Sequence, residues 1–105
     1  MALLADQVDQ TFLDGLVEQF ARLYPDIAGI RDRITAIMSR AHRYGIRGQD
    51  DIGWFVGLDF ARGHEWEQLP GMEWALDILD NPRVDMAGRR FRLEKWMRKW
   101  DSNGV

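Results

Sequence analysis

The chain has 105 residues, 46% of them apolar and 30% charged, which is typical of one globular domain and excludes long disorder. It has no cysteine, which excludes disulfides, thiolate zinc sites, iron–sulfur clusters and a cysteine nucleophile. No apolar run approaches the roughly 20 residues of a membrane span. The short apolar stretch 1–5 lacks a basic flank, so we expect no signal peptide and a cytoplasmic location.

The first two predicted helices are amphipathic. Residues 6–23 have apolar side chains at spacings of three and four, namely Val8, Phe12, Leu16, Phe20 and Leu23. Pro25 ends this helix or opens the next, which spans residues 26–44. Its apolar stripe is Ile27, Ile30, Ile34, Ile37 or Met38, and Ala41, and its opposite face carries arginines that include Arg33 and Arg40. Gly45 has the position of a C-terminal cap, with Ile46 closing back onto the helix end.

Three more helices follow, and no strand pattern or repeat interrupts them. Residues 49–62 are apolar over much of the circumference, which predicts the central helix. After a loop at 63–71 we expect a short helix at 72–79 and a last one at 85–100, separated by the turn Asp80-Asn81-Pro82. The sequence therefore predicts an all-α, compact bundle of about five helices without a sheet. It forms a single domain, 1–105, in which 101–105 are a disordered tail.

Few residues of this sequence are candidates for catalysis or metal binding. His64-Glu65 resembles the start of a zinc motif, but Gln68 stands where the second histidine belongs. Neighbouring carboxylates such as Asp50 and Asp51 are explained by the helix dipole at a helix start. We therefore expect no catalytic residues, no metal, no cofactor and no enzyme activity.

Trp66, in the loop at 63–71, is a candidate contact residue. It lies between two acidic residues and beside Leu69-Pro70. One interpretation is that it clamps the loop onto the core. The other is that it is an exposed anchor for a partner, since aromatic side chains dominate interface hot spots.

The charge distribution points to the last helix. Residues 1–81 hold 7 basic and 14 acidic side chains, whereas residues 82–100 hold 7 basic and 2 acidic ones. Four basic residues recur there at helical spacing, namely Arg89, Arg92, Lys95 and Lys99. The apolar face of this helix, which includes Leu93, packs on its own domain or on a partner. The basic face is either solvated or binds an acidic protein. Specific nucleic-acid binding is not expected, because the rest of the domain repels phosphates.

Several segments together resemble a known group of proteins. They are residues 40–46 (Arg-Ala-His-Arg-Tyr-Gly-Ile), 50–52 (Asp-Asp-Ile), 55–58 (Phe-Val-Gly-Leu), 74–82 (Trp-Ala-Leu-Asp-Ile-Leu-Asp-Asn-Pro) and the basic last helix. Over residues 30–100 the chain resembles small helical proteins of bacterial effector loci, accessory partners of the adaptor chaperones that load toxins onto the type VI secretion spike. The resemblance implies a cytoplasmic co-chaperone that binds an adaptor chaperone, an effector toxin or both.

The expected function is therefore protein binding without catalysis. The predicted contact residues are Trp66, Arg89, Arg92, Lys95 and Lys99. Two alternatives remain open. The chain is an immunity protein whose acidic residues 1–81 cover a basic toxin active site, or it is a small nucleic-acid-binding regulator that uses the last helix.

Overall fold

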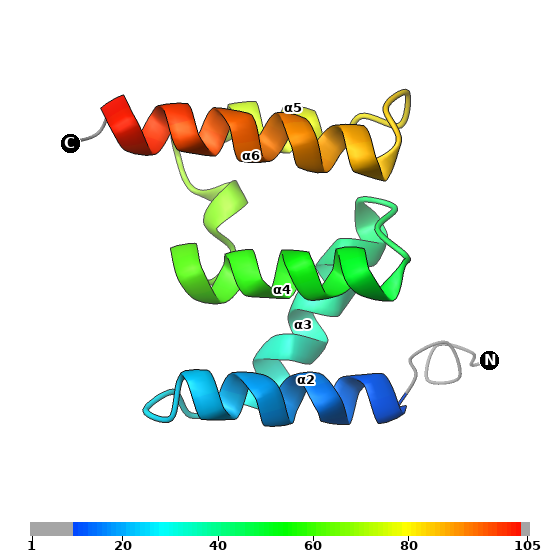
Figure 1. Cartoon of the computed structure of the whole chain (residues 1–105), viewed down its shortest axis with the longest axis vertical. Helices are drawn as coiled ribbons and strands as arrows, with labels where there is room; N and C mark the ends of the chain where they lie inside the picture. Colours follow the sequence, from blue (N-terminus) through cyan, green and yellow to red (C-terminus); the bar gives the residue numbers. More distant parts are fainter. Residues whose placement is uncertain (1–9, 104–105) are drawn as a thin grey trace.

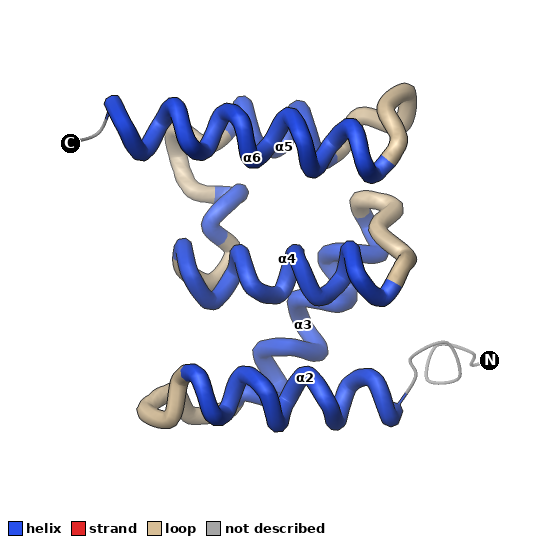
Figure 2. The backbone as a smooth tube through the Cα atoms, viewed as in Figure 1, coloured by secondary structure: helices blue, strands red, loops and turns tan. Residues whose placement is uncertain are grey.

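The computed structural model describes residues 10–103, with side chains described as far as Lys99. Every regular element in this part of the chain is helical, which confirms the all-α prediction (Figure 2). Five α-helices, α2 to α6, follow one another, and a short 3-10 helix, η1 (Trp66–Gln68), lies between α4 and α5. None of these helices is both long and apolar enough to cross a bilayer.

Helix α2 (Gln10–Leu23) buries one face, formed by Leu13, Leu16 and Phe20. Residues 6–9 of the predicted helix lie outside the described residues. Leu23, which we predicted to belong to the apolar stripe, is 61% exposed. It is the last residue of the helix, and the chain turns away immediately after it at Pro25 and Asp26.

Helix α3 (Ile30–Arg43) begins four residues later than predicted. Gly29 has a φ of 68°, a left-handed conformation that glycine adopts without a steric penalty, and this interrupts any helix starting at Asp26. The end of the helix is as predicted. Gly45 has a φ of 79°, and the backbone N–H of Ile46 donates to the carbonyl of Ala41 (2.9 Å), which brings the Ile46 side chain into the core.

Helix α4 (Gln49–Arg62) has the predicted bounds and buries Ile52, Phe55 and Val56. Seen down the short axis of the molecule, it lies between α2 and α6, and α3 crosses behind α2 and α4 (Figure 1). Helix α3 packs against both of these helices. The central position predicted for residues 49–62 is therefore confirmed.

The chain ends with α5 (Glu73–Leu79) and α6 (Met86–Asn103), which pack against each other (Figure 1). Leu93 of α6 is fully buried, and Met86 and Met97 pack against the core beside it. The apolar face of α6 therefore covers its own domain. Helix α6 continues to Asn103, so the predicted tail at 101–105 is helical over its first three residues.

Candidate functional site

The structure divides the five predicted contact residues into a buried and an exposed group. Trp66, in η1, is only 2% exposed, with the Arg62 guanidinium 5.6 Å from the centre of its ring. The clamp interpretation is therefore the one that fits. Trp66 holds the loop against the core, and its side chain is not accessible to a partner.

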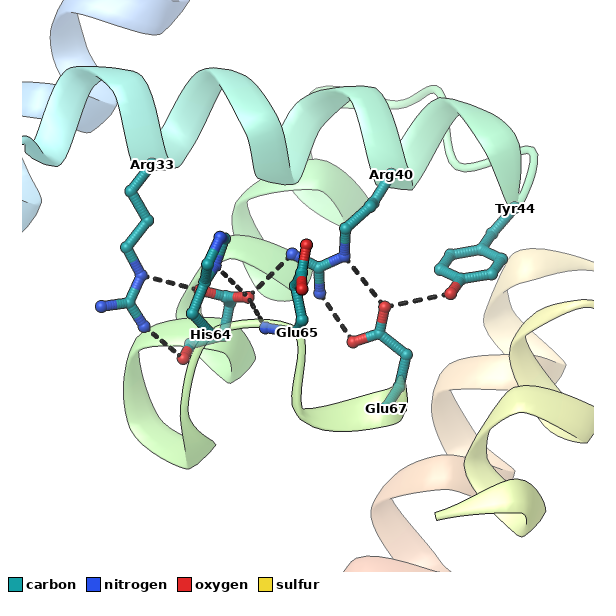
Figure 3. A network of polar contacts seen from close by, with 7 residues as sticks. Arg33, Arg40, Tyr44, His64, Glu65 and Glu67 are labelled. Carbon is teal, nitrogen blue, oxygen red and sulfur yellow. Dashed lines mark hydrogen bonds and ion pairs between the residues drawn. The ribbon is translucent and has the colours of Figure 1, made fainter. Parts of the chain in front are cut away.

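A buried charge network holds the same loop in place (Figure 3). Arg40 of α3 is 2% exposed and donates two hydrogen bonds to the carboxylate of Glu67, at 2.9 and 2.6 Å. Its third hydrogen bond, 2.9 Å long, goes to Asp59 of α4. Tyr44 donates its hydroxyl proton to Glu67 at 3.0 Å. Arg40 thus joins the loop to two helices through charge-assisted hydrogen bonds.

Asp59 is the second centre of this network and is fully buried. It accepts hydrogen bonds from Arg33 (2.9 Å) and from the backbone N–H of Glu65 (2.9 Å), and Nδ1 of His64 lies 3.1 Å from it. Glu65 itself has a left-handed backbone, with a φ of 59°, which turns its N–H towards Asp59. With the bond from Arg40, the Asp59 carboxylate therefore has four polar partners.

Burial and hydrogen bonding act in opposite directions on these groups. Burial alone would raise the pKa of Asp59, but the hydrogen bonds that it accepts, with the Glu65 backbone first, lower the pKa below its ordinary value. Burial would lower the pKa of Arg40, yet Glu67 and Asp59 raise it. Burial and the charge of Glu67 raise the pKa of Tyr44 to about 12. All three groups therefore keep one protonation state around neutral pH.

The sequence prediction was wrong about Arg33 and Arg40, which it placed on the solvent side of α3. The spacing does indicate that they lie together beside the core. Arg33, Arg40 and Tyr44 are seven and four residues apart and share one flank of the apolar stripe. Their partners in α4 and η1 could not be inferred from local spacing. Because every charge in the network is matched, its role is to fix the loop.

Arg89 is buried too, and it does not belong to an exposed basic face. Its Nε donates to the carbonyl of Val84 at 2.7 Å. Its Nη1 donates to the carbonyls of Tyr44 (2.7 Å) and Leu79 (3.2 Å). These carbonyls lie at the ends of α3 and α5, where the helix dipole favours a cation. Arg89 therefore joins three helices and is a structural residue.

The other three predicted residues, Arg92, Lys95 and Lys99, are exposed on α6. Two aromatic residues are exposed on the same helix, Phe91 at 64% and Trp96 at 49%. We call the following exposed residues the α6 outer face: Phe91, Arg92, Lys95, Trp96, Arg98 and Lys99. Neither Phe91 nor Trp96 was among the predicted contact residues.

The basic side chains of the α6 outer face have no ion-pair partner among the carboxylates that the structure describes. The Lys99 ammonium lies 4.9 Å from the centre of the Trp96 ring, which is a cation–π contact. Arg90, by contrast, faces inwards and pairs with Asp51 at 3.0 Å. Among the described α6 side chains, the exposed cations without a carboxylate partner therefore lie on its outer side.

Two surface hollows adjoin α6. The first, about 430 Å³, lies where α3 and α5 end, and Arg89 and Asp80 contribute to its lining. The second, about 360 Å³, is lined by Asp51, Ala87, Arg90, Phe91 and Glu94, and so borders the α6 outer face. Within residues 10–103, no three histidine or carboxylate side chains gather closely enough to hold a metal ion.

Comparison with protein-family models, curated proteins and solved structures finds no match to this chain. Two features of the structure bear on function, namely the buried network and the α6 outer face. The first explains how the loop is fixed. The second has no explanation within the fold.

Proposed function

We propose that this chain is a non-catalytic, protein-binding accessory that assists a secretion adaptor or effector toxin, of the type VI kind, in the cytoplasm. One observation carries the proposal: the α6 outer face exposes four cations and two aromatic side chains without a carboxylate among them. Helix α6 packs on the domain through its other side, centred on Leu93.

Folding does not require this outer face. Exposed ion pairs contribute only about 0–1 kcal/mol each, and these cations make none with the described carboxylates. Aromatic residues and arginine are enriched in protein interfaces, where they form many of the hot spots. A surface of this composition is therefore better explained by recognition than by stability.

The secretion assignment depends on the sequence resemblance. Several residues of that resemblance have structural roles here, since Gly45 and Ile46 cap α3 and the N–H of Arg83 donates to the side chain of Asn81 at 3.0 Å in the turn before α6. The proposal that the partner is an adaptor or an effector rests on this resemblance together with the basic, aromatic α6 outer face.

Coexpression tests the proposal. The full chain is produced with the proteins encoded by the genes that flank its own, and complexes are isolated by size-exclusion chromatography. We expect a stoichiometric complex with an adaptor or an effector, which the double variant Arg92→Glu/Lys95→Glu loses. The control, Arg47→Glu/Arg83→Glu, reverses two other exposed cations and makes the same change in net charge, and it should retain the complex.

Two outcomes would contradict the proposal. A complex with a toxin alone that blocks the active site of the toxin and survives the α6 substitutions would indicate an immunity protein that binds through its acidic residues. A complex with nucleic acid at physiological salt and no protein partner would indicate a regulator.

A further inference from the structure

The charged and aromatic residues of the α6 outer face indicate the chemistry of its partner. We infer that it binds an acidic polypeptide segment with at least three carboxylates along about 12 Å, the length of the eight residue steps from Phe91 to Lys99, and with apolar side chains beside them. The inference rests on the proposed function, since it names the partner chemistry for the same surface.

Charge is the first argument. Arg92, Lys95, Arg98 and Lys99 are exposed and have no described carboxylate as partner. Close charge pairs across an interface speed association and fix the register of the two partners. The ligand that matches four clustered cations is therefore anionic.

The size of the positive patch favours a polypeptide over nucleic acid. Helix α5 packs along α6 and exposes Glu73 and Asp77. Glu94, on the flank of α6, accepts a hydrogen bond from Trp54 at 3.0 Å. A nucleic acid continues its charge well beyond 12 Å, along a domain whose residues 1–81 hold 14 acidic and only 7 basic side chains. A short acidic segment can be matched by the four cations of the α6 outer face alone.

The two aromatic residues favour a polypeptide over a membrane. Phe91 and Trp96 are five residues apart, so they point in directions about 140° apart around the helix. A helix that inserts into a lipid surface needs a single continuous apolar face, whereas here the apolar face packs on the core. A polypeptide seated along the cations can contact both aromatic side chains.

Each aromatic side chain has a neighbouring feature that suits such a segment. Trp96 is held beside Lys99 by the 4.9 Å cation–π contact. Phe91 is 64% exposed, and with Ala87 it forms the apolar part of the hollow of about 360 Å³, whose other lining residues are Asp51, Arg90 and Glu94. The structure thus places apolar contacts on both sides of the basic residues.

The test uses the full chain and a short synthetic peptide of alternating Glu-Glu and Leu-Leu pairs. Binding of the peptide is measured by fluorescence anisotropy. Its counterpart has Gln in place of every Glu. A single-stranded oligonucleotide and phosphatidylglycerol vesicles are the other two probes. We expect the acidic peptide to bind, with affinity reduced about tenfold or more for the Gln peptide and for Arg92→Glu/Lys95→Glu. The control Arg47→Glu/Arg83→Glu should stay within about twofold of the wild type.

A second pair of variants tests the apolar contacts. Phe91→Ala should weaken peptide binding, whereas Leu23→Ala, which shortens an equally exposed side chain on α2, should not. Equal affinity for the acidic and Gln peptides would overturn the inference. Tighter binding of the oligonucleotide or the vesicles than of the acidic peptide would overturn it as well.

Failure of the inference is distinguishable from failure of the proposed function. If the peptide does not bind but a flanking-gene partner does, through α6, the inference is wrong and the proposed function stands. If the peptide binds but no flanking-gene protein associates, the proposed function is wrong and the chemistry of the surface stands. Melting curves of each variant show that it is folded, and the milder Lys95→Gln replaces the double variant if that one unfolds.

Discussion

Removing Arg40 is the most informative test of the buried network. The variant Arg40→Met keeps much of the side-chain volume and deletes the charge. Glu67 then loses both of its arginine hydrogen bonds and keeps only the one from Tyr44. Asp59 loses one bond but retains those from Arg33 and the Glu65 backbone. The cost therefore falls mainly on Glu67.

The expected magnitude follows from burial. Arg40, Asp59 and Glu67 are all at most 2% exposed. Deleting one partner of a buried ion pair typically costs about 3–5 kcal/mol, because a buried charge is left uncompensated. Since small domains have unfolding free energies of about 5–15 kcal/mol, the loss is a large fraction of the total. It should appear as a clear shift in the urea midpoint, followed by circular dichroism at neutral pH.

Two further variants separate charge from packing. Arg33→Met removes a partly exposed arginine from Asp59 while Arg40 remains, so it should cost less, about 1.5–3 kcal/mol. Adding Glu67→Gln to Arg40→Met neutralises the stranded carboxylate and should recover part of the loss, as a double-mutant cycle would show. An unfolding free energy of Arg40→Met within about 1 kcal/mol of the wild type would refute the buried network. So would a Glu67→Gln addition that recovers nothing.

The remaining predictions concern the core, the glycines and pH. Ile34→Ala or Phe55→Ala, at fully buried positions, should each lower the unfolding free energy by about 2–5 kcal/mol, and an unchanged melting temperature would show that the core lies elsewhere. Gly15 lies within α2, and a Cβ added there meets no other atom, so Gly15→Ala should stabilise the fold by about 0.5–1 kcal/mol. Gly45 has a φ of 79°, so Gly45→Ala should destabilise the fold by about 1–2 kcal/mol. The same sign for both variants would contradict the backbone described for Gly45. Because folding lowers the pKa of Asp59, its contribution is present above the unfolded value of about 3.9 and is lost as pH falls through the folded pKa. Urea unfolding between about pH 5 and pH 2 should show this loss, and Asp59→Asn should reduce the slope.

The helices themselves were predictable because apolar periodicity is a local signal. Helix α4 was predicted with its observed bounds, and the Gly45 cap of α3 was predicted as well. The start of α3 was missed because a left-handed Gly29 ends the turn after Pro25, and the periodicity of Ile27 and Ile30 hides that break. A glycine inside a periodic pattern does not show its backbone conformation.

The candidate site was harder to predict because exposure depends on distant residues. Arg89 and Arg92 have similar neighbours in the sequence, yet the first is buried because two helix ends, at Tyr44 and Leu79, converge on it. Arg40 is buried because Glu67, 27 residues away, reaches it. Spacing identified the faces of α6, but only the packing of α5 and α3 showed which cations remain exposed.

The central claim is that the α6 outer face recognises a partner and is not needed for folding. The most direct test measures the association rate constant of Arg92→Glu/Lys95→Glu with the partner isolated by coexpression, at low and at physiological salt, beside its melting temperature. We predict a melting temperature within about 3 °C of the wild type and association slowed about tenfold at low salt, with the difference shrinking as salt rises. Wild-type association by the folded variant would contradict the claim, and so would a variant that no longer folds.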